Sequence, residues 1–279
     1  MSAANGCYID LDIPLPINPQ ELFDDKDIEF IECENPFPKY SEPFTTTNIH
    51  WNVFKKPTPD GTIGFITNKD ILDKCKDFFE STFKINPLAY KQRSGYGYYP
   101  ITLVKFNQTS AYHREGFADW YTDEHKKLFK SRFQMAINFK MYGDVEGTEV
   151  RFGEPSNLIV EQEKKLTNKI LERNRKRVAK GGEQLGTKHF SRVSVSNDDK
   201  TMSVYLGRTG FYDKNFEEEN IETKVVRQGY YSPFIINVQQ WHKVVTSTKP
   251  RVSLRFMCGD KYTFEELEHL HAGGNLINA

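Results

Sequence analysis

The chain has 279 residues, a length that permits one large domain or two small ones. Its 38 Lys and Arg residues balance 38 Asp and Glu residues, so the net charge gives no general attraction to nucleic acid or to an anionic membrane. A hydrophobic content of 38% with 14% aromatic residues excludes a disordered chain and favours a β-rich core.

The four cysteines lie far apart and form no CxxC pair, which argues against a zinc ribbon or a thioredoxin-like motif. Scattered thiols in a chain of this length indicate reduced, mostly buried cysteines. Residues 1–15 lack the regions of a secretory signal, and no run of about 18 apolar residues predicts a membrane span. We therefore expect a soluble, cytoplasmic protein that makes no membrane contact.

Residues 1–66 are predicted to form a Pro-rich N-terminal arm of irregular structure. Prolines interrupt every apolar run in the first sixty residues and push the residue before them toward extended geometry. We expect this arm to wrap the surface of the domain that follows. A helix is then predicted over residues 68–83, where apolar side chains recur on one stripe and Asn68 can cap the start.

The next segments alternate between strand and helix patterns. Strands are predicted over residues 95–104 and 133–141, and the second half of 112–129 resembles a short helix. Residues 146–160 suggest a strand pair or a strand with a loop. Residues 161–182 form a charge-rich helix ended by Gly181-Gly182, which we expect to be a solvated insertion. Binding of a nucleic acid or another acidic partner is an alternative role for this helix, and simple exposure of its charged residues to solvent is the favoured interpretation.

Short strands bounded by turns follow, over residues 192–195, 202–206, 221–228, 231–238 and 242–258. The predicted core domain covers residues 67–260, and residues 261–279 form a C-terminal helix and tail. Many short strands with a few helices outside them predict a mainly β protein with a sandwich or jelly-roll architecture.

The stretch WHKVVTSTKPRVSLRF holds the most informative side chains. Arg251, Ser253 and Arg255 alternate with apolar residues, so on a strand they share one face. Alternation alone favours a half-exposed strand with its arginines in water. His242 stands nine residues before Arg251, a distance that a strand, a turn and a second strand can span. An imidazole beside a guanidinium and a hydroxyl indicates a pocket for a metal and an organic acid.

This pattern resembles the distal iron ligand and co-substrate anchor of the Fe(II)/2-oxoglutarate-dependent oxygenases. The resemblance implies a double-stranded β-helix (jelly-roll or cupin-like) core with flanking helices. It also implies that His242 binds iron and that Arg251 and Ser253 hold the far carboxylate of 2-oxoglutarate. It covers residues 95–258, and within the superfamily the chain resembles the aspartyl/asparaginyl β-hydroxylase-like branch.

The family also has an upstream His-x-Asp or His-x-Glu pair, and this chain has His113 and Glu115. Residues two apart on an extended segment project from one side, so both side chains can reach one ion. The family's usual carboxylate is Asp, and the extra methylene of Glu115 shifts its oxygens. Asp119 and Asp123 are the alternatives, and a site without a carboxylate ligand, or without iron, is another.

Other polar side chains receive weaker assignments. Tyr98, Gln134 and Asn138 lie on predicted strands and can line the pocket, although a polar group bonded to a neighbouring strand is the simpler interpretation. His50, His125 and His189 have no partner at ligand spacing and are interpreted as surface or structural, and Trp241 as packing.

Two functions follow. The first is a 2-oxoglutarate-dependent dioxygenase that hydroxylates a C–H bond of an amino-acid, peptidyl or small-molecule substrate, with a modified base also compatible. Phe117, Trp120 and Tyr121 would then form part of a substrate lid. The second is a non-catalytic jelly-roll structural or adaptor protein with a degenerate metal site, since a fold does not guarantee its usual activity.

Overall fold

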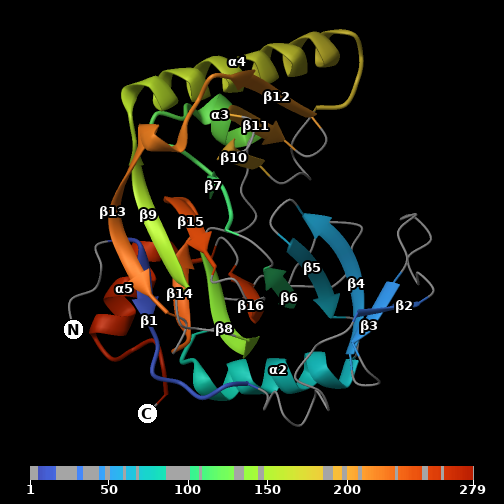
Figure 1. Ribbon diagram of the computed structural model, residues 1–279, viewed down its shortest axis with the longest axis vertical. Helices are drawn as coiled ribbons and strands as arrows, with labels where there is room; N and C mark the ends of the chain where they lie inside the picture. The colour runs from blue at the N-terminus through green and yellow to red at the C-terminus, as the bar shows by residue number, and fades with distance from the viewer. Residues whose placement is uncertain are drawn as a thin grey trace.

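The protein is built from two antiparallel β-sheets with helices packed outside them (Figure 1). The computed structural model describes residues 6–16, 30–33, 44–47, 51–58, 61–66, 69–85, 101–106, 109–128, 135–143, 148–184, 191–196, 200–206, 209–229, 232–246, 251–258 and 261–278. Within these residues, no helix is long and apolar enough to cross a membrane. The predicted mainly β class is confirmed.

The larger sheet has nine strands in the order β1-β14-β8-β16-β6-β5-β4-β3-β2. Their bounds are β1 Tyr8–Asp10, β2 Phe30–Cys33, β3 Phe44–Thr47, β4 Trp51–Thr58, β5 Gly61–Ile66, β6 Ile101–Phe106, β8 Met135–Gly143, β14 Phe234–Asn237 and β16 Arg251–Cys258.

The smaller sheet has seven strands in the order β12-β11-β10-β7-β15-β9-β13. Their bounds are β7 Tyr112–Glu115, β9 Glu149–Pro155, β10 Ser191–Ser196, β11 Thr201–Leu206, β12 Thr209–Lys214, β13 Ile221–Gln228 and β15 Trp241–Val245. The helices are α2 Lys69–Thr82, α3 Asp123–Leu128, α4 Asn157–Ala179 and α5 Phe264–Ala272, and η1 Glu218–Asn220 is a short 3₁₀ turn.

Eight of the strands pair in a nested order. The outermost pair in sequence is β6 with β16, followed inward by β7 with β15, β8 with β14, and β9 with β13. Pairing of β15 with β9 and of β16 with β8 joins these pairs into the two sheets. The chain therefore runs out and back as one long hairpin, whose middle connection contains α4 and β10–β12.

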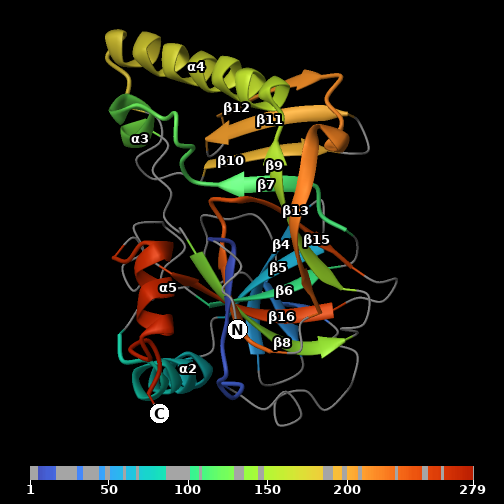
Figure 2. The same cartoon turned by 90° about the vertical axis from the view of Figure 1, so that its left-hand side faces the viewer.

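Helices α2 and α5 cover the outer face of the larger sheet (Figure 2). The predicted stripe of α2 is confirmed in part, because Cys75, Phe79 and Phe83 are buried in this layer. Phe79 packs against Phe256 of β16 at 4.4 Å between ring centroids. At about 25 cal/mol per Å² of apolar area, buried rings of this size contribute several kcal/mol. Helix α5 begins at a capping box between Thr263 and Glu266.

The inner faces of the two sheets share a second apolar cluster. Ala136, Phe234 and Ile236 from the larger sheet pack with Val150, Phe152 and Val244 from the smaller one. The sheets are therefore packed face to face, and the alternate residues on both inner faces point into one interior.

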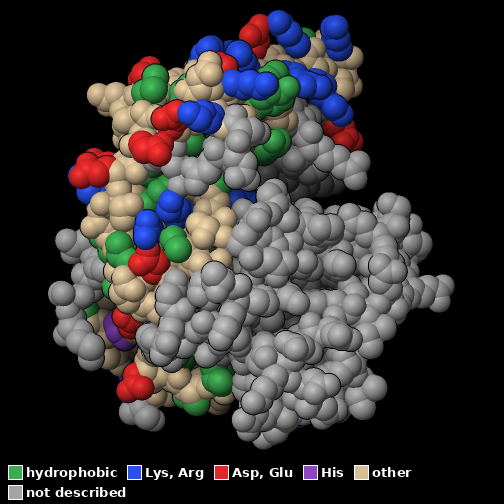
Figure 3. Space-filling model, in the orientation of Figure 1, with side chains coloured by type: hydrophobic (Ala, Val, Ile, Leu, Met, Phe, Trp, Pro, Cys, Tyr) green, Lys and Arg blue, Asp and Glu red, His purple; other side chains and the backbone are tan. Residues whose placement is uncertain are grey.

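Helix α4 covers the outer face of the smaller sheet, and this corrects the expectation of a fully solvated helix. Ile159, Leu166 and Ile170 are fully buried against Val193 and Val204 of β10 and β11. The charged residues of α4 lie mainly on its opposite side, where Figure 3 shows Lys and Arg side chains gathered. The predicted insertion is also larger, since β10, β11 and β12 continue it as three added strands.

The prediction that residues 1–66 are irregular is wrong for β1 to β5. These strands extend the larger sheet at both edges. The proline within them, Pro57, lies near the end of β4, beyond the residues that pair with β3, so its missing N–H interrupts no bond to that strand. Strand β12 was not predicted, since TGFYDK does not alternate clearly between apolar and polar residues. The predicted strand within 146–160 is β9, and the rest of that range is the start of α4.

An ion pair anchors α4 to β7. Arg114 lies on the face of β7 that points outward, where it bonds to Glu163 of α4 and donates to the Gly116 carbonyl oxygen at 3.0 Å. The side chains of Arg114 and Glu163 are 3% and 2% exposed. Burial disfavours the charged guanidinium, but the attraction and hydrogen bonds of Glu163 and Tyr121 together outweigh it and raise the pKa of Arg114.

We expect Glu163→Gln to destabilise the protein by about 3–5 kcal/mol, because it leaves the buried Arg114 charge without its counter-ion. Urea unfolding monitored by circular dichroism measures this loss. The matched control is Glu161→Gln, since Glu161 is 70% exposed and pairs with Lys164 on the same helix. Its expected cost is below about 1 kcal/mol. Equal effects of the two substitutions would contradict the anchoring role of Arg114 and Glu163.

Candidate functional site

Two histidines from different strands meet on the inner face of the smaller sheet. His113 of β7 and His242 of β15 are direct cross-strand partners, and their ring centroids lie 4.3 Å apart with the planes tilted by 53°. His242 is 3% exposed, and Phe152 of β9 lies beside it at 6.3 Å between ring centroids. The structure thus brings together the two histidines that the sequence singled out 129 positions apart.

Both imidazoles are held in the same tautomer by the backbone. His113 Nδ1 lies 2.8 Å from the carbonyl oxygen of Ala111, and His242 Nδ1 lies 2.8 Å from that of Gln240. A carbonyl oxygen only accepts hydrogen bonds, so each Nδ1 must carry the hydrogen. Each neutral ring then presents Nε2 as a bare lone pair. A histidine that binds a metal through Nε2 commonly makes this backbone bond through its other nitrogen.

Burial and charge keep both rings neutral. Burial lowers the pKa of His113 well below its usual range, with further lowering by Arg192 and His242. Burial also lowers the pKa of His242 to about 3, although the bond to Gln240 opposes this, and the charges of Arg255 and Arg192 lower it further. Neutral imidazole is the form that binds a metal.

Glu115 occupies the same face of β7 as His113. It is 5% exposed, and its Oε2 atom is buried and has no hydrogen-bond partner among the described residues. Burial raises the pKa of Glu115, whereas Arg255 and Arg192 lower it. A buried carboxylate oxygen without a partner is costly, which makes it a fitting ligand for a cation.

Two arginines that the sequence analysis did not assign to the site lie beside these residues. Arg192 of β10 is the direct cross-strand partner of Glu115, and Arg255 of β16 comes from the facing sheet. Both influence the pKa of His113, Glu115 and His242. The alternation of residues 251–256 already grouped Arg255 with Ser253, but nothing local in the sequence indicated Arg192.

The predicted co-substrate anchor is described in part. Ser253 is 2% exposed, and its Oγ atom has no hydrogen-bond partner among the described residues. Asn138 of β8 is 8% exposed and pairs with Arg255 across the larger sheet. The backbone of Arg251 begins β16, but its side chain lies outside the described residues, as do Tyr98 and Gln134. The role predicted for Arg251 stays a prediction.

The alternative carboxylates are placed elsewhere. Asp119 and Asp123 are exposed, and Asp123 begins α3. His125 is buried and bonds to Thr122 and Asn168, which confirms its structural role, whereas His50 and His189 lie outside the described residues.

The aromatic residues predicted as a lid are instead part of the core under α4. Tyr121 is 4% exposed, and Phe117 and Trp120 pack against the same cluster. Trp241 belongs to this cluster as well, which confirms that it is a packing residue.

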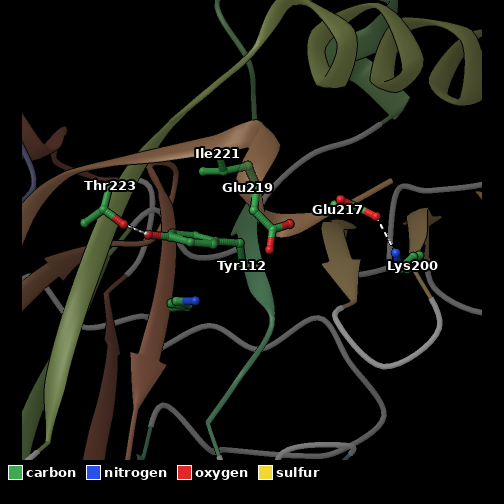
Figure 4. Close-up of a pocket in the computed structure, with 7 residues that line it drawn as sticks. Tyr112, Lys200, Glu217, Glu219, Ile221 and Thr223 are labelled. Atoms are coloured by element: carbon green, nitrogen blue, oxygen red, sulfur yellow. Dashed lines mark hydrogen bonds and ion pairs between the residues drawn. The ribbon is translucent and has the colours of Figure 1, made fainter. Parts of the chain in front are cut away.

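A pocket of about 530 Å³ lies on the other side of the smaller sheet (Figure 4). Tyr112 lines it and bonds to Thr223 at 2.6 Å between the two oxygens, and Lys243 sits over the Tyr112 ring. Because Tyr112 and His113 are adjacent on a strand, their side chains point to opposite faces. This pocket is therefore separate from the histidine pair.

Within the described part of the chain, no three His, Cys, Asp or Glu side chains are grouped so as to hold a metal ion. The two histidines are in place, and Glu115 as positioned does not complete a three-ligand set. Comparison with known proteins adds no assignment, since no family model, curated protein or solved structure matches the chain.

The depressed pKa of His242 makes the metal-free protein less stable in acid. The unfolded histidine binds a proton below about pH 6.5, while the folded one stays neutral down to about pH 3. Stability is therefore fully present above pH 6.5 and is lost progressively as the pH falls through this window. In excess chelator, the free energy of unfolding should fall between pH 7 and pH 4.5 by roughly 2–3 kcal/mol less in His242→Gln than in the native chain.

Urea unfolding at a series of pH values measures this difference. His269→Gln is the control, because His269 is exposed on α5 and should keep the native acid sensitivity. An unchanged slope in His242→Gln would show that the ring is not buried in its neutral form.

Proposed function

We propose that the protein is an Fe(II)- and 2-oxoglutarate-dependent dioxygenase that hydroxylates a C–H bond, with His113 and His242 as iron ligands and Glu115 as the third. The observation that carries the proposal is the histidine pair, whose rings lie 4.3 Å apart between centroids and whose Nδ1 atoms are both bonded to the backbone. Three protein ligands on one side of iron leave positions for a co-substrate and dioxygen.

The nested strand pairing supports a double-stranded β-helix. A long hairpin wound into two four-stranded sheets is the topology of a jelly roll, and the pairs β6·β16, β7·β15, β8·β14 and β9·β13 follow it. In this arrangement β7, β15 and β16 bring His113, His242 and Arg255 to one interior.

The charge around the histidines suits an organic diacid. Arg192 and Arg255 bring two positive charges, while Glu115 is the described acidic group that both influence. A buried guanidinium is stabilised by an anion, and its planar fork matches a carboxylate. The hydroxyl of Ser253 lies two positions from Arg255 on β16 and can donate a further hydrogen bond.

The residues would hold iron if Glu115 turned its Oε2 atom, which has no hydrogen-bond partner among the described residues, toward the two imidazoles. Bound iron would couple dioxygen activation to decarboxylation of 2-oxoglutarate. The chain itself supplies two oriented neutral imidazoles, an anion-binding arginine and an interior shielded by Phe152. These features position the co-substrate and exclude water.

A non-catalytic jelly-roll protein is the second candidate. The absence of a complete three-ligand group among the described residues favours it, and so does the Glu in place of the family's usual Asp. In this case Arg192 and Arg255 would simply neutralise Glu115.

Anaerobic titration of the metal-free protein with Fe(II) and then 2-oxoglutarate tests the proposal. We expect a visible charge-transfer band that requires both additions and disappears in His242→Ala. Arg255→Ala and Arg251→Ala, measured in parallel, show which arginine binds the far carboxylate of 2-oxoglutarate. Replacing that arginine should leave Fe(II) binding intact and greatly raise the 2-oxoglutarate concentration needed for the band.

Glu115→Asp and Glu115→Gln form a matched pair for the third ligand. We expect the Asp variant to keep the band and the Gln variant to weaken Fe(II) binding by about 10-fold or more. Absence of the band from a folded native protein would refute the oxygenase and leave the non-catalytic scaffold.

A further inference from the structure

The inner face of the added strands β10, β11 and β12 continues directly from the histidine pair. One cross-strand row runs from His242 through His113, Ser194 and Ser203 to Tyr212. Direct partners in an antiparallel sheet project from the same face. The hydrogen bond of 2.9 Å between the hydroxyls of Ser194 and Ser203 agrees with this placement.

A second row runs beside the first. It joins Glu115 to Arg192, then to Tyr205 and Gly210. A side chain at Gly210 would collide with Tyr205, because an added Cβ would lie 2.3 Å from the ring. The Tyr205 ring therefore rests on the backbone of β12 at Gly210, which holds it in a defined position on this face.

The opposite face of the same strands is already covered. Val193, Val204 and Phe211 alternate with the residues of the two rows, and they pack under α4. Figure 2 shows β12, β11, β10 and β7 following one another away from α4. The two rows thus lie on the side of the sheet that α4 does not occupy.

The face is both aromatic and basic. Tyr205 is 43% exposed and Tyr212 is 66% exposed, so both rings are accessible to a ligand. Lys214 is exposed two positions after Tyr212 and therefore on the same face. With Arg192 near the site and Lys214 at the far edge, the described charges of the added strands on this face are positive.

A ligand that contacts both the histidine pair and Tyr212 must be extended. Three strand spacings of about 4.8 Å separate β7 from β12, which gives roughly 14 Å between the histidine pair and Tyr212. A free amino acid cannot span this length. Exposed rings with basic side chains on an open sheet form a surface on which bases stack while phosphates meet the cations.

We propose that this face, defined by Arg192, Tyr205, Tyr212 and Lys214, binds single-stranded nucleic acid and leads it to the histidine pair. The inference deepens the proposed function by naming the substrate class of the same site, and it rests on that function for the chemistry only. Binding to the face itself requires neither iron nor 2-oxoglutarate. A basic peptide is disfavoured because the described residues of this face carry no acidic group other than Glu115, and an acidic peptide is one outcome that the test below distinguishes.

The test is fluorescence anisotropy of the metal-free full chain with labelled single-stranded DNA and RNA of about 12 nucleotides and mixed sequence. We expect binding that weakens with salt and that falls about 5- to 100-fold in Tyr212→Ala. Tyr212→Phe should retain the affinity, since it keeps the ring. Tyr205→Ala should weaken binding similarly, and Lys214→Glu should lower the affinity and the salt dependence.

Matched controls separate this face from other surfaces. Leu158→Ala removes a hydrophobic side chain of comparable exposure, 54%, from α4 and should leave the affinity unchanged. Arg175→Glu and Lys176→Glu change the basic side of α4 and should have a smaller effect than Tyr212→Ala.

The outcomes distinguish the two proposals. Oligonucleotide binding that depends on the tyrosines, without an iron band, would support nucleic-acid binding by this face and refute the oxygenase. An iron band without oligonucleotide binding would support the oxygenase and refute nucleic-acid binding. Binding that depends on Arg175 and Lys176 but not on the tyrosines would overturn the assignment to this face. Tighter binding of an acidic peptide would overturn nucleic acid as the ligand class. Tighter binding of the double-stranded form of the same sequence would overturn the stacking of unpaired bases on the tyrosines.

Discussion

The alternation of side chains along β7 is the constraint on which the rest of the structure depends. Arg114 points outward to its buried ion pair with Glu163, so His113 and Glu115 on either side of it must point inward. A shift of one residue in the register of β7 would exchange its inward and outward side chains and place the Arg114 guanidinium in the interior. The same ion pair that fastens α4 to the sheet therefore determines which residues of β7 face the interior.

The interior that results is polar at one end and apolar at the other. Phe152, Phe234 and Ile236 pack between the sheets, whereas the two histidines meet beside arginines from both sheets. Burying such a cluster costs desolvation free energy, so it is stable only if a ligand or a hydrogen-bond network offsets that cost. The proposed ligand site rests on the unprotonated Nε2 atoms of the two histidines and on the Glu115 oxygen that has no partner among the described residues.

Strands β10, β11 and β12 extend the smaller sheet beyond β7. Their outer face packs against α4. On the inner face Ser203 is buried, while Tyr205 and Tyr212 are exposed. Because β10 pairs directly with β7, this inner face is continuous with the face that carries His113. One insertion thus places Arg192 beside Glu115 and two exposed tyrosines on the same side of the sheet.

The sequence by itself determined what depends on local periodicity. It predicted the stripe of α2, most of the strands after residue 100, the shared face of His113 and Glu115, and the grouping of Ser253 with Arg255. Only the tertiary structure decided which strands are neighbours. It placed His242 opposite His113, brought Arg192 to Glu115, added β1 to β5 to the larger sheet, and buried one side of α4. The physical reason is that strand pairing joins segments far apart in the chain, and neither partner carries a local signal that identifies the other.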